Sequence, residues 1–281
     1  MFNSALNRIR NSTLRSPLQR SLSRIASVAA LVLVPAGSVR AADMPVKAPK
    51  PAAPVYNWTG CYVGLNGGGG ASGTNFHARV DPGSYLGATD AAETSNDGTG
   101  SHNNSNFLGG GQAGCNWQTG TVVAGIEGDF DYFHSNSSFF NDTNTLPVLG
   151  LPFGIGQPLT TNYLATVRPR IGIAADRNFG YITGGVAFTR ANYTESYADA
   201  NTPPATGAAA GSRSLTGWTA GAGWEYAWTD HWLLRVEYLY ASFSTTSALG
   251  TITEPGTGTN VLHGSSDLVI QVIRAAANFK F

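Results

Sequence analysis

Apolar residues recur at every second position in eight segments between Trp58 and the last residue, Phe281. Side chains two residues apart lie on the same face of a β-strand, so each segment predicts a strand with one apolar face. The last of them, "VIRAAANFKF", carries this pattern to the chain end, where small or polar residues are more usual. The predicted strands cover residues 58–69, 105–117, 121–134, 161–174, 179–190, 214–228, 231–244 and 268–281.

The connections between these segments alternate in length. Short turns such as "QTG", "AADRN" and "TDH" separate longer polar stretches, expected as loops over residues 70–104, 135–160, 191–213 and 244–267. A β-strand needs about 9–11 residues to cross a membrane, and the predicted strands are at least that long. Long loops at one end and short turns at the other are typical of outer-membrane barrels. The sequence predicts an all-β fold: an eight-stranded antiparallel up-and-down transmembrane β-barrel with four long outer loops and three short periplasmic turns.

The face opposite the apolar one carries charged residues, which the barrel would place in its lumen. Because the lumen of an eight-stranded barrel is barely wider than its side chains, these charges have to pair. The predicted salt-bridge network consists of Glu127, Asp129, Asp131, Arg168, Arg170, Glu225, Arg235, Glu237, Arg274 and Lys280. The alternative is a constriction through which ions pass, where the same residues would set the selectivity.

The apolar face would be exposed to water in a soluble protein but is stable against lipid. Four tryptophans near the short turns, Trp58, Trp117, Trp228 and Trp232, are expected to form an interfacial aromatic girdle. A soluble periplasmic β-protein is the competing interpretation.

The N-terminal 42 residues have the layout of a secretory signal peptide: five arginines, an apolar run from Ile25 to Val34, and small residues before Asp43. A mitochondrial transit peptide is the alternative, since the segment is rich in Arg and Ser. Residues 43–57 contain four prolines and predict a periplasmic tether, which leaves 58–281 for the barrel. Six of the 17 basic residues and none of the 17 acidic ones lie in the signal segment, so a mature chain of net charge about −6 argues against nucleic-acid binding.

Cys61 and Cys115 are the two cysteines of the chain. The predicted strands place both near the short-turn ends of neighbouring strands and on the outward face, where they could form a disulfide in an oxidising compartment. Two lipid-facing or buried thiols are the alternative.

The five histidines are scattered without metal-ligand spacing, and no motif indicates a cofactor, so we expect neither a metal nor a cofactor. A lipid-modifying enzyme would need a histidine beside a serine or carboxylate at the loop end. His134 with Asp131 or Ser135 is the nearest candidate, but the sequence favours a protein that is not an enzyme.

Several stretches resemble the small outer-membrane immunogenic proteins of α-proteobacteria, a porin-like family with a barrel similar to that of outer-membrane protein A. They include "YNWTGCYVGLNGG", "GGGQAGCNWQ", "GIEGDF", "RPRIG", "GWTAGAGWEYAW", "WLLRVEYLY" and the terminal "ANFKF". The resemblance covers nearly the whole mature chain. It implies that the C-terminal strand, through Phe279 and Phe281, is read as an assembly signal by the barrel-assembly machinery.

These observations together predict a structural protein of the cell outer membrane. It would contact outer-membrane lipid and lipopolysaccharide, contribute to membrane integrity and display its long loops outside, with both termini in the periplasm. A homo-oligomer is compatible with the sequence. The second hypothesis is a pore-forming porin that passes small solutes or ions.

Overall fold

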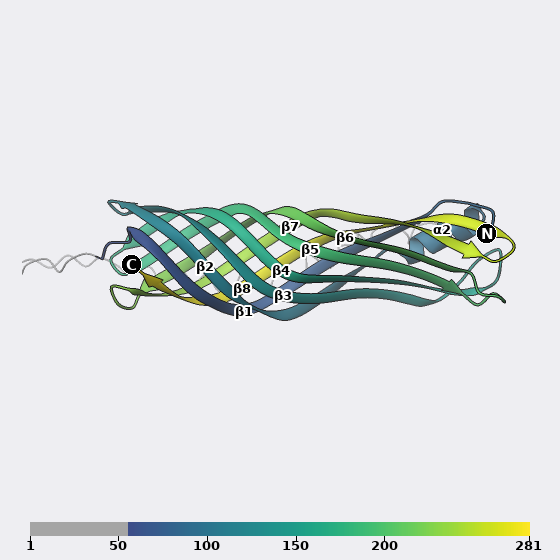
Figure 1. Cartoon of the computed structure of the whole chain (residues 1–281), viewed down its shortest axis with the longest axis horizontal. Coiled ribbons are helices and arrows are strands. Elements are labelled where there is room, and N and C mark those ends of the chain that lie inside the picture. Colours follow the sequence, from purple (N-terminus) through teal and green to yellow (C-terminus); the bar gives the residue numbers. More distant parts are fainter. Residues whose placement is uncertain (1–55) are drawn as a thin grey trace, which may run out of the picture. The chain divides into compact units, whose positions relative to one another are not determined.

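Eight antiparallel strands follow one another around a closed barrel in the computed structural model, which describes residues 56–281 except for the side chain of Thr143 (Figure 1). Strand β8 pairs with β1 to close the ring, with Phe279 opposite Val63. The eight-stranded up-and-down barrel is therefore confirmed. The strands are β1 (Gly60–Val80), β2 (Gly100–Thr119), β3 (Val122–Thr145), β4 (Pro152–Ala175), β5 (Asn178–Asp199), β6 (Thr206–Ala227), β7 (Trp232–Glu254) and β8 (Gly258–Lys280).

One helix, α2 (Ala88–Asp97), lies between β1 and β2, at the end of the barrel opposite the C-terminus (Figure 1). No helix within residues 56–281 is long and apolar enough to cross a membrane. The predicted signal peptide and residues 43–55 of the predicted tether lie outside the described residues.

The strands are much longer than the sequence pattern predicted, between 20 and 24 residues each. Most of the four stretches expected as loops continue the strands. The connections at the outer end, the end that carries α2, cover only residues 81–99, 146–151, 200–205 and 255–257. The polar composition of these stretches concealed their alternation, because here the polar residues face outward and the apolar residues face inward.

A belt of exposed apolar side chains surrounds the half of the barrel that contains the short turns. On β2 and β3 it extends from Phe107 to Trp117 and from Val122 to Tyr132, and about ten residues are enough for a tilted strand to cross the apolar core of a membrane. Its large members include Val63, Leu65, Phe107, Trp117, Val122, Ile126, Phe130, Tyr132, Val167, Ile171, Ile173, Ile182, Val186, Phe188, Trp218, Trp224, Leu234, Val236, Tyr238, Ile273 and Phe279. We call this surface the apolar belt.

The tryptophans near the short turns divide between surface and interior. Trp117, Trp228 and Trp232 are 58%, 65% and 45% exposed, in agreement with an aromatic girdle. Trp58 is fully buried, so its assignment to the girdle is wrong. Its ring packs 5.1 Å from that of Phe179, and its indole Nε1 donates a hydrogen bond to the carbonyl of Asp176.

Beyond the apolar belt the barrel reverses its polarity. Asn75 and Thr194 are exposed on the outside of β1 and β5, whereas their neighbours Phe76 and Tyr193 are buried and their rings stack inside. Figure 1 shows the strands continuing to the outer end. This outer half therefore has the apolar core and polar surface of a water-soluble protein. The core includes Phe76, Val80, Leu86, Leu108, Phe133, Phe153, Ile155, Leu159, Tyr193, Leu215, Phe243, Ile252, Leu262 and Leu268.

Strand pairing is lost over long stretches at two places in the outer half, whereas β3–β4, β4–β5 and β7–β8 show only short register shifts there. Pairing between β2 and β3 stops at Leu108 and Phe133, and residues 209–216 of β6 have no ladder partners in β7. The strands therefore separate here into two four-stranded sheets, β3–β4–β5–β6 and β7–β8–β1–β2, which Thr206–Ala208 and Thr251–Thr253 join again near the tip. The apolar core lies between these two sheets and takes the place of the missing hydrogen bonds in holding them together.

We predict that replacing Phe76 by Ala lowers the free energy of unfolding by about 3–5 kcal/mol, because it removes a fully buried ring from the core of the outer half. Phe140→Ala is the matched control, since Phe140 is 69% exposed, and its effect should stay below about 0.5 kcal/mol. Urea unfolding of the folded barrel measures both. Equal, small losses would contradict a packed outer core.

Candidate functional site

Nine charged side chains meet inside the barrel at the level of the apolar belt. They lie at inward positions of five strands, because residues two apart on one strand share a face. We call them the ionic layer: Glu127, Asp129 and Asp131 on β3, Arg168 and Arg170 on β4, Glu225 on β6, Arg235 and Glu237 on β7, and Arg274 on β8. All nine are buried.

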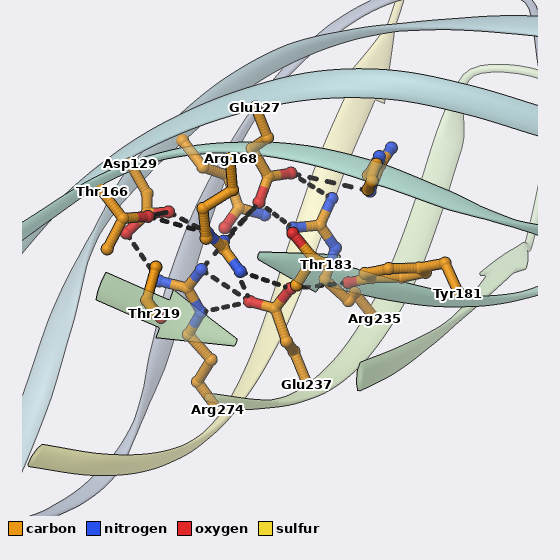
Figure 2. Close-up of polar contacts among 12 residues, drawn as sticks. Glu127, Asp129, Thr166, Arg168, Tyr181, Thr183, Thr219, Arg235, Glu237 and Arg274 are labelled. Atoms are coloured by element: carbon orange, nitrogen blue, oxygen red, sulfur yellow. Dashed lines mark hydrogen bonds and ion pairs between the residues drawn. The ribbon is translucent and has the colours of Figure 1, made fainter. Parts of the chain in front are cut away.

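Arg168 connects three carboxylates across the barrel (Figure 2). Its guanidinium lies 2.8 Å from a carboxylate oxygen of Glu127, 2.8 Å from one of Asp129 and 3.1 Å from one of Glu237. The guanidinium Nε also donates a hydrogen bond to the hydroxyl of Thr166. This side chain thereby links β4 to β3 and β7.

Arg274 lies opposite Glu237, farther from the short turns than Arg235 is, and Figure 2 shows its guanidinium beside the Glu237 carboxylate. It contacts Asp131 at 2.5 Å, Glu237 at 2.7 Å and Asp129 at 3.3 Å. These contacts connect β8 to β3 and β7.

Arg170 and Arg235 occupy the side of the layer nearer the short turns. Both pair with Glu225, with Arg170 at 2.7 Å, and both also contact Glu127. The guanidinium of Arg170 lies over the rings of Tyr62 and Tyr181, 4.9 and 5.1 Å from their centroids. Such contacts stabilise a cation that has been removed from water.

Neutral polar side chains complete the ionic layer, and the sequence interpretation missed them. Tyr62 of β1 donates a hydrogen bond to Glu127, and Tyr181 of β5 donates one to Glu237. Asn116 of β2 accepts a hydrogen bond from Arg170, and Thr166 donates one to Asp129. With these residues every strand contributes to the layer. They could have been predicted from the alternation of the strands, because they have inward positions at the same level of the barrel as the charged residues.

Inward-facing glycines provide the room for these large side chains. A Cβ atom at Gly114 would overlap the hydroxyl of Tyr62, and one at Gly223 would overlap the ring of Tyr181. A side chain at either position would force an inner residue to move.

Lys280 was predicted to belong to the network but lies at the short-turn end of the barrel. Its Nζ atom donates to the carbonyl of Asn57 and sits 4.6 Å from the centroid of the Tyr56 ring. Lys280 is too close to the strand end to reach the layer, which leaves five acids and four bases there.

A cluster of buried apolar side chains, which we call the apolar plug, lies inside the barrel at the short-turn end. The tether was predicted to extend to residue 57, yet Tyr56 is buried and its hydroxyl donates to the carbonyl of Asp230. The plug consists of Tyr56, Trp58, Val123, Ala174, Phe179, Tyr181, Ala227 and Leu233. The barrel interior thus contains three layers: the apolar plug, the ionic layer and the apolar core of the outer half.

Cys61 and Cys115 are opposite each other on β1 and β2 and are joined by a disulfide bond. Phe281 follows the last strand, and its backbone N–H donates to the carbonyl of Cys61. The Phe281 ring is 70% exposed. The ring of Phe279 packs against His231 and Trp232.

The candidate catalytic residues do not come together. His134 is exposed on the outer surface and its ring contacts Asn162, whereas Asp131 and Ser135 are buried on the other face of β3. Residues 56–281 contain no group of three His, Cys, Asp or Glu side chains arranged to hold a metal ion.

A closed barrel with an apolar belt and a buried ionic layer defines a membrane β-barrel protein. Residues 29–281 match the family model described as the outer membrane protein beta-barrel domain, and the chain belongs to this family. It is 34% identical over 227 residues to the 31 kDa outer-membrane immunogenic protein of Brucella melitensis, which covers 77% of this chain and 84% of that protein. It is 29% identical to the 25 kDa outer-membrane immunogenic protein of Brucella canis, covering 80% of this chain and 86% of that protein.

Among solved structures, the outer membrane protein OprG of Pseudomonas aeruginosa aligns with a TM-score of 0.41 and 10% identity, covering 80% of this chain and 99% of that one. The family match and the two relatives confirm the predicted resemblance to outer-membrane immunogenic proteins. The chain is accordingly a structural β-barrel protein of the cell outer membrane, in contact with outer-membrane lipid.

We predict that Arg168→Met lowers the free energy of unfolding by about 3–5 kcal/mol, because it leaves three buried carboxylates without their shared cation. Urea unfolding, followed on a gel by the different migration of folded and heated protein, measures the loss. Arg79→Met is the control: the Arg79 side chain is 69% exposed, so little change is expected. Equal stability of the two variants would contradict a structural ionic layer.

Proposed function

We propose that this barrel is closed to solutes, anchors in the outer membrane, contributes to its integrity, and holds a rigid, water-exposed outer half above it. The ionic layer carries this proposal. Side chains from all eight strands meet in it, and ion pairs at 2.5–3.3 Å connect strands that are not neighbours, β8 with β3 and β4 with β7. Such contacts hold the barrel wall together from inside.

A pore for small solutes is not favoured. Ions or solutes would have to pass through the apolar plug, the ionic layer and the outer core in turn. The plug includes Trp58 and Phe179, and the outer core includes Phe76 and Phe133, all fully buried. Conduction would require several of these side chains to move together.

The orientation that fits best places the outer half outside the cell and both ends of the described chain in the periplasm. The predicted signal peptide supports export, and the polar surface of the outer half suits water. Val148 is 71% exposed in the β3–β4 connection, so the Val148→Cys variant should react with a membrane-impermeant maleimide on intact cells. If the Val148→Cys variant is not labelled and a Thr229→Cys variant is, the barrel has the opposite orientation to the one proposed.

The C-terminal strand supports a role for Phe279 and Phe281 in assembly. The exposed Phe281 ring and the outward Phe279 ring give the end of β8 an apolar edge that a barrel-assembly machine could bind. Deleting Phe281 should reduce the amount of folded barrel in the outer membrane. An unchanged amount would contradict a role of Phe281 in assembly.

The outer surface of the barrel presents polar side chains and the four connections, which suits surface display rather than catalysis. The separation of His134 from Asp131 and Ser135 supports a function without enzymatic chemistry. Lipopolysaccharide is the lipid that the outward half of the apolar belt would meet in the proposed orientation.

We predict that the folded wild-type barrel gives no discrete conductance steps in planar bilayers, because side chains fill its lumen. A gel shift on heating confirms that the protein tested is folded. Reproducible ion-selective steps that change with Glu127→Gln would contradict the closed barrel and establish the pore.

A further inference from the structure

Glu195 is a buried acid in the core of the outer half. It occupies an inward position on β5 and is fully buried. Neutral groups hold both carboxyl oxygens: Oε1 accepts a hydrogen bond of 2.9 Å from the side-chain amide of Gln157, and Oε2 accepts one of 3.2 Å from the hydroxyl of Tyr193. Among the residues that the structure describes, none forms an ion pair with Glu195, in contrast to the paired acids of the ionic layer.

The Glu195 carboxyl lies at the contact between the two four-stranded sheets of the outer half. β5 belongs to one sheet, and the carboxyl reaches Gly264 of β8 in the other, where a Cβ atom would overlap its Oε2. Ala78 of β1 and Ala248 of β7 are opposite Gly264, so a row of small residues makes room for the carboxyl. Burial of Glu195 therefore depends on the two sheets staying together.

Strand pairing is missing at the same level of the barrel. Glu195 is opposite Ala209, the first residue of the stretch of β6 that has no ladder partners in β7. Ala248 belongs to the facing stretch of β7, which has none in β6. We call these two stretches, residues 209–216 and 244–250, the seam. Because the sheets can separate here without breaking a ladder between β6 and β7, side-chain packing is what keeps the seam closed.

The charged groups around the Glu195 carboxyl do not neutralise it. His263 of β8 is the residue before Gly264, but its ring nitrogen Nε2 lies 2.8 Å from a carboxylate oxygen of Asp81. Arg213 has an inward position on β6, nearer the membrane half, and its side chain is exposed. The other buried titratable groups of the outer half are acids and phenols: Tyr85, Asp90, Tyr193, Tyr197, Asp199 and Glu254.

This environment favours the protonated form of the carboxyl. Burial raises the pKa of Glu195 above its ordinary value of 4.5, although the hydrogen bonds from Gln157 and Tyr193 and the charge of His263 act in the opposite direction. The closed outer half thus binds this proton more tightly than an opened one, in which water surrounds the carboxyl. The resulting stability is fully present below pH 4.5 and is lost as the pH rises through the pKa of the closed state.

We propose that Glu195 is a pH-sensitive switch of the outer half: its protonated carboxyl keeps the two sheets closed, and its ionised carboxylate favours their separation at the seam. Separation lets water reach a charge that neutral groups alone cannot stabilise. The inference rests on the proposed exposure of the outer half to water, and it makes the rigidity proposed for that half dependent on pH. The membrane half, which is a complete ring, is not expected to open with it.

The test is amide hydrogen exchange of the folded barrel in lipid, measured by mass spectrometry for peptides of the seam. Protection factors correct for the effect of pH on the intrinsic exchange rate. Between about pH 4 and about pH 8 we expect protection of the wild-type seam to fall severalfold, because the opened state loses the proton more readily. Glu195→Gln replaces the carboxyl by a neutral group of the same shape, so its protection should equal that of the wild type in acid and change little as the pH rises. Asp97 of α2, whose pKa burial also raises, is present in both proteins and does not affect their difference.

Two further variants sharpen the comparison, and a gel shift on heating shows that each is folded. Asp142→Asn is the matched control, because Asp142 is an exposed acid of the outer half on β3, and it should keep the wild-type pH dependence. Gln157→Met removes a donor that favours the ionised carboxylate, so its fall in protection should be larger than that of the wild type.

The proposal is overturned if Glu195→Gln loses protection with pH as the wild type does, or if Gln157→Met has the wild-type profile. An equal loss of protection in peptides of the ionic layer, such as residues 122–131, would also overturn it, because opening would then not be confined to the outer half. These exchange results are independent of the conductance and labelling results, which test the closed, oriented barrel.

Discussion

Pairing of buried charge is the constraint on which the structure of the membrane-spanning half depends. Five carboxylates and four guanidinium groups occupy a lumen from which side chains exclude water, and an unpaired charge there would be very unfavourable. Each arginine therefore contacts at least two acids, and those acids lie on different strands. The ion pairs require these charged residues to face inward. The ionic layer leaves no room for a side chain at inward positions such as Gly114 and Gly223, so glycine is needed there.

The two halves of the barrel are stabilised by opposite arrangements of the same strands. In the membrane half, apolar side chains face lipid and polar ones face each other; in the outer half, apolar side chains such as Phe76 form the core and polar ones such as Asn75 face water. The outer half can therefore separate into two sheets around an apolar core, while the membrane half, where lipid cannot satisfy an open strand edge, remains a complete ring.

The sequence was sufficient to predict the eight strands, the disulfide partners and nine of the ten lumen charges, because alternation and short turns define inward positions directly. It failed where polarity is reversed: segments such as 191–199 look like polar loops until Tyr193 and Tyr197 are recognised as the inward face of β5. It also misplaced Trp58 and Lys280. Alternation along the strands does not show that the residues before β1 enter the barrel, where Trp58 is buried and where Asn57 binds Lys280. Tyr62 and Asn116 were missed because the identity of a neutral residue does not indicate that it forms a hydrogen bond with a charged side chain.

The most direct test of the closed ionic layer is the exchange of guanidinium protons with water, measured by nuclear magnetic resonance for the folded barrel in lipid. The structure predicts that the protons of Arg168 and Arg235, which are enclosed by carboxylates and by apolar layers on both sides, exchange far more slowly than those of the exposed Arg79. Exchange at Arg168 and Arg235 as fast as at Arg79 would mean that water passes through the layer, and would contradict a barrel closed by its own charges.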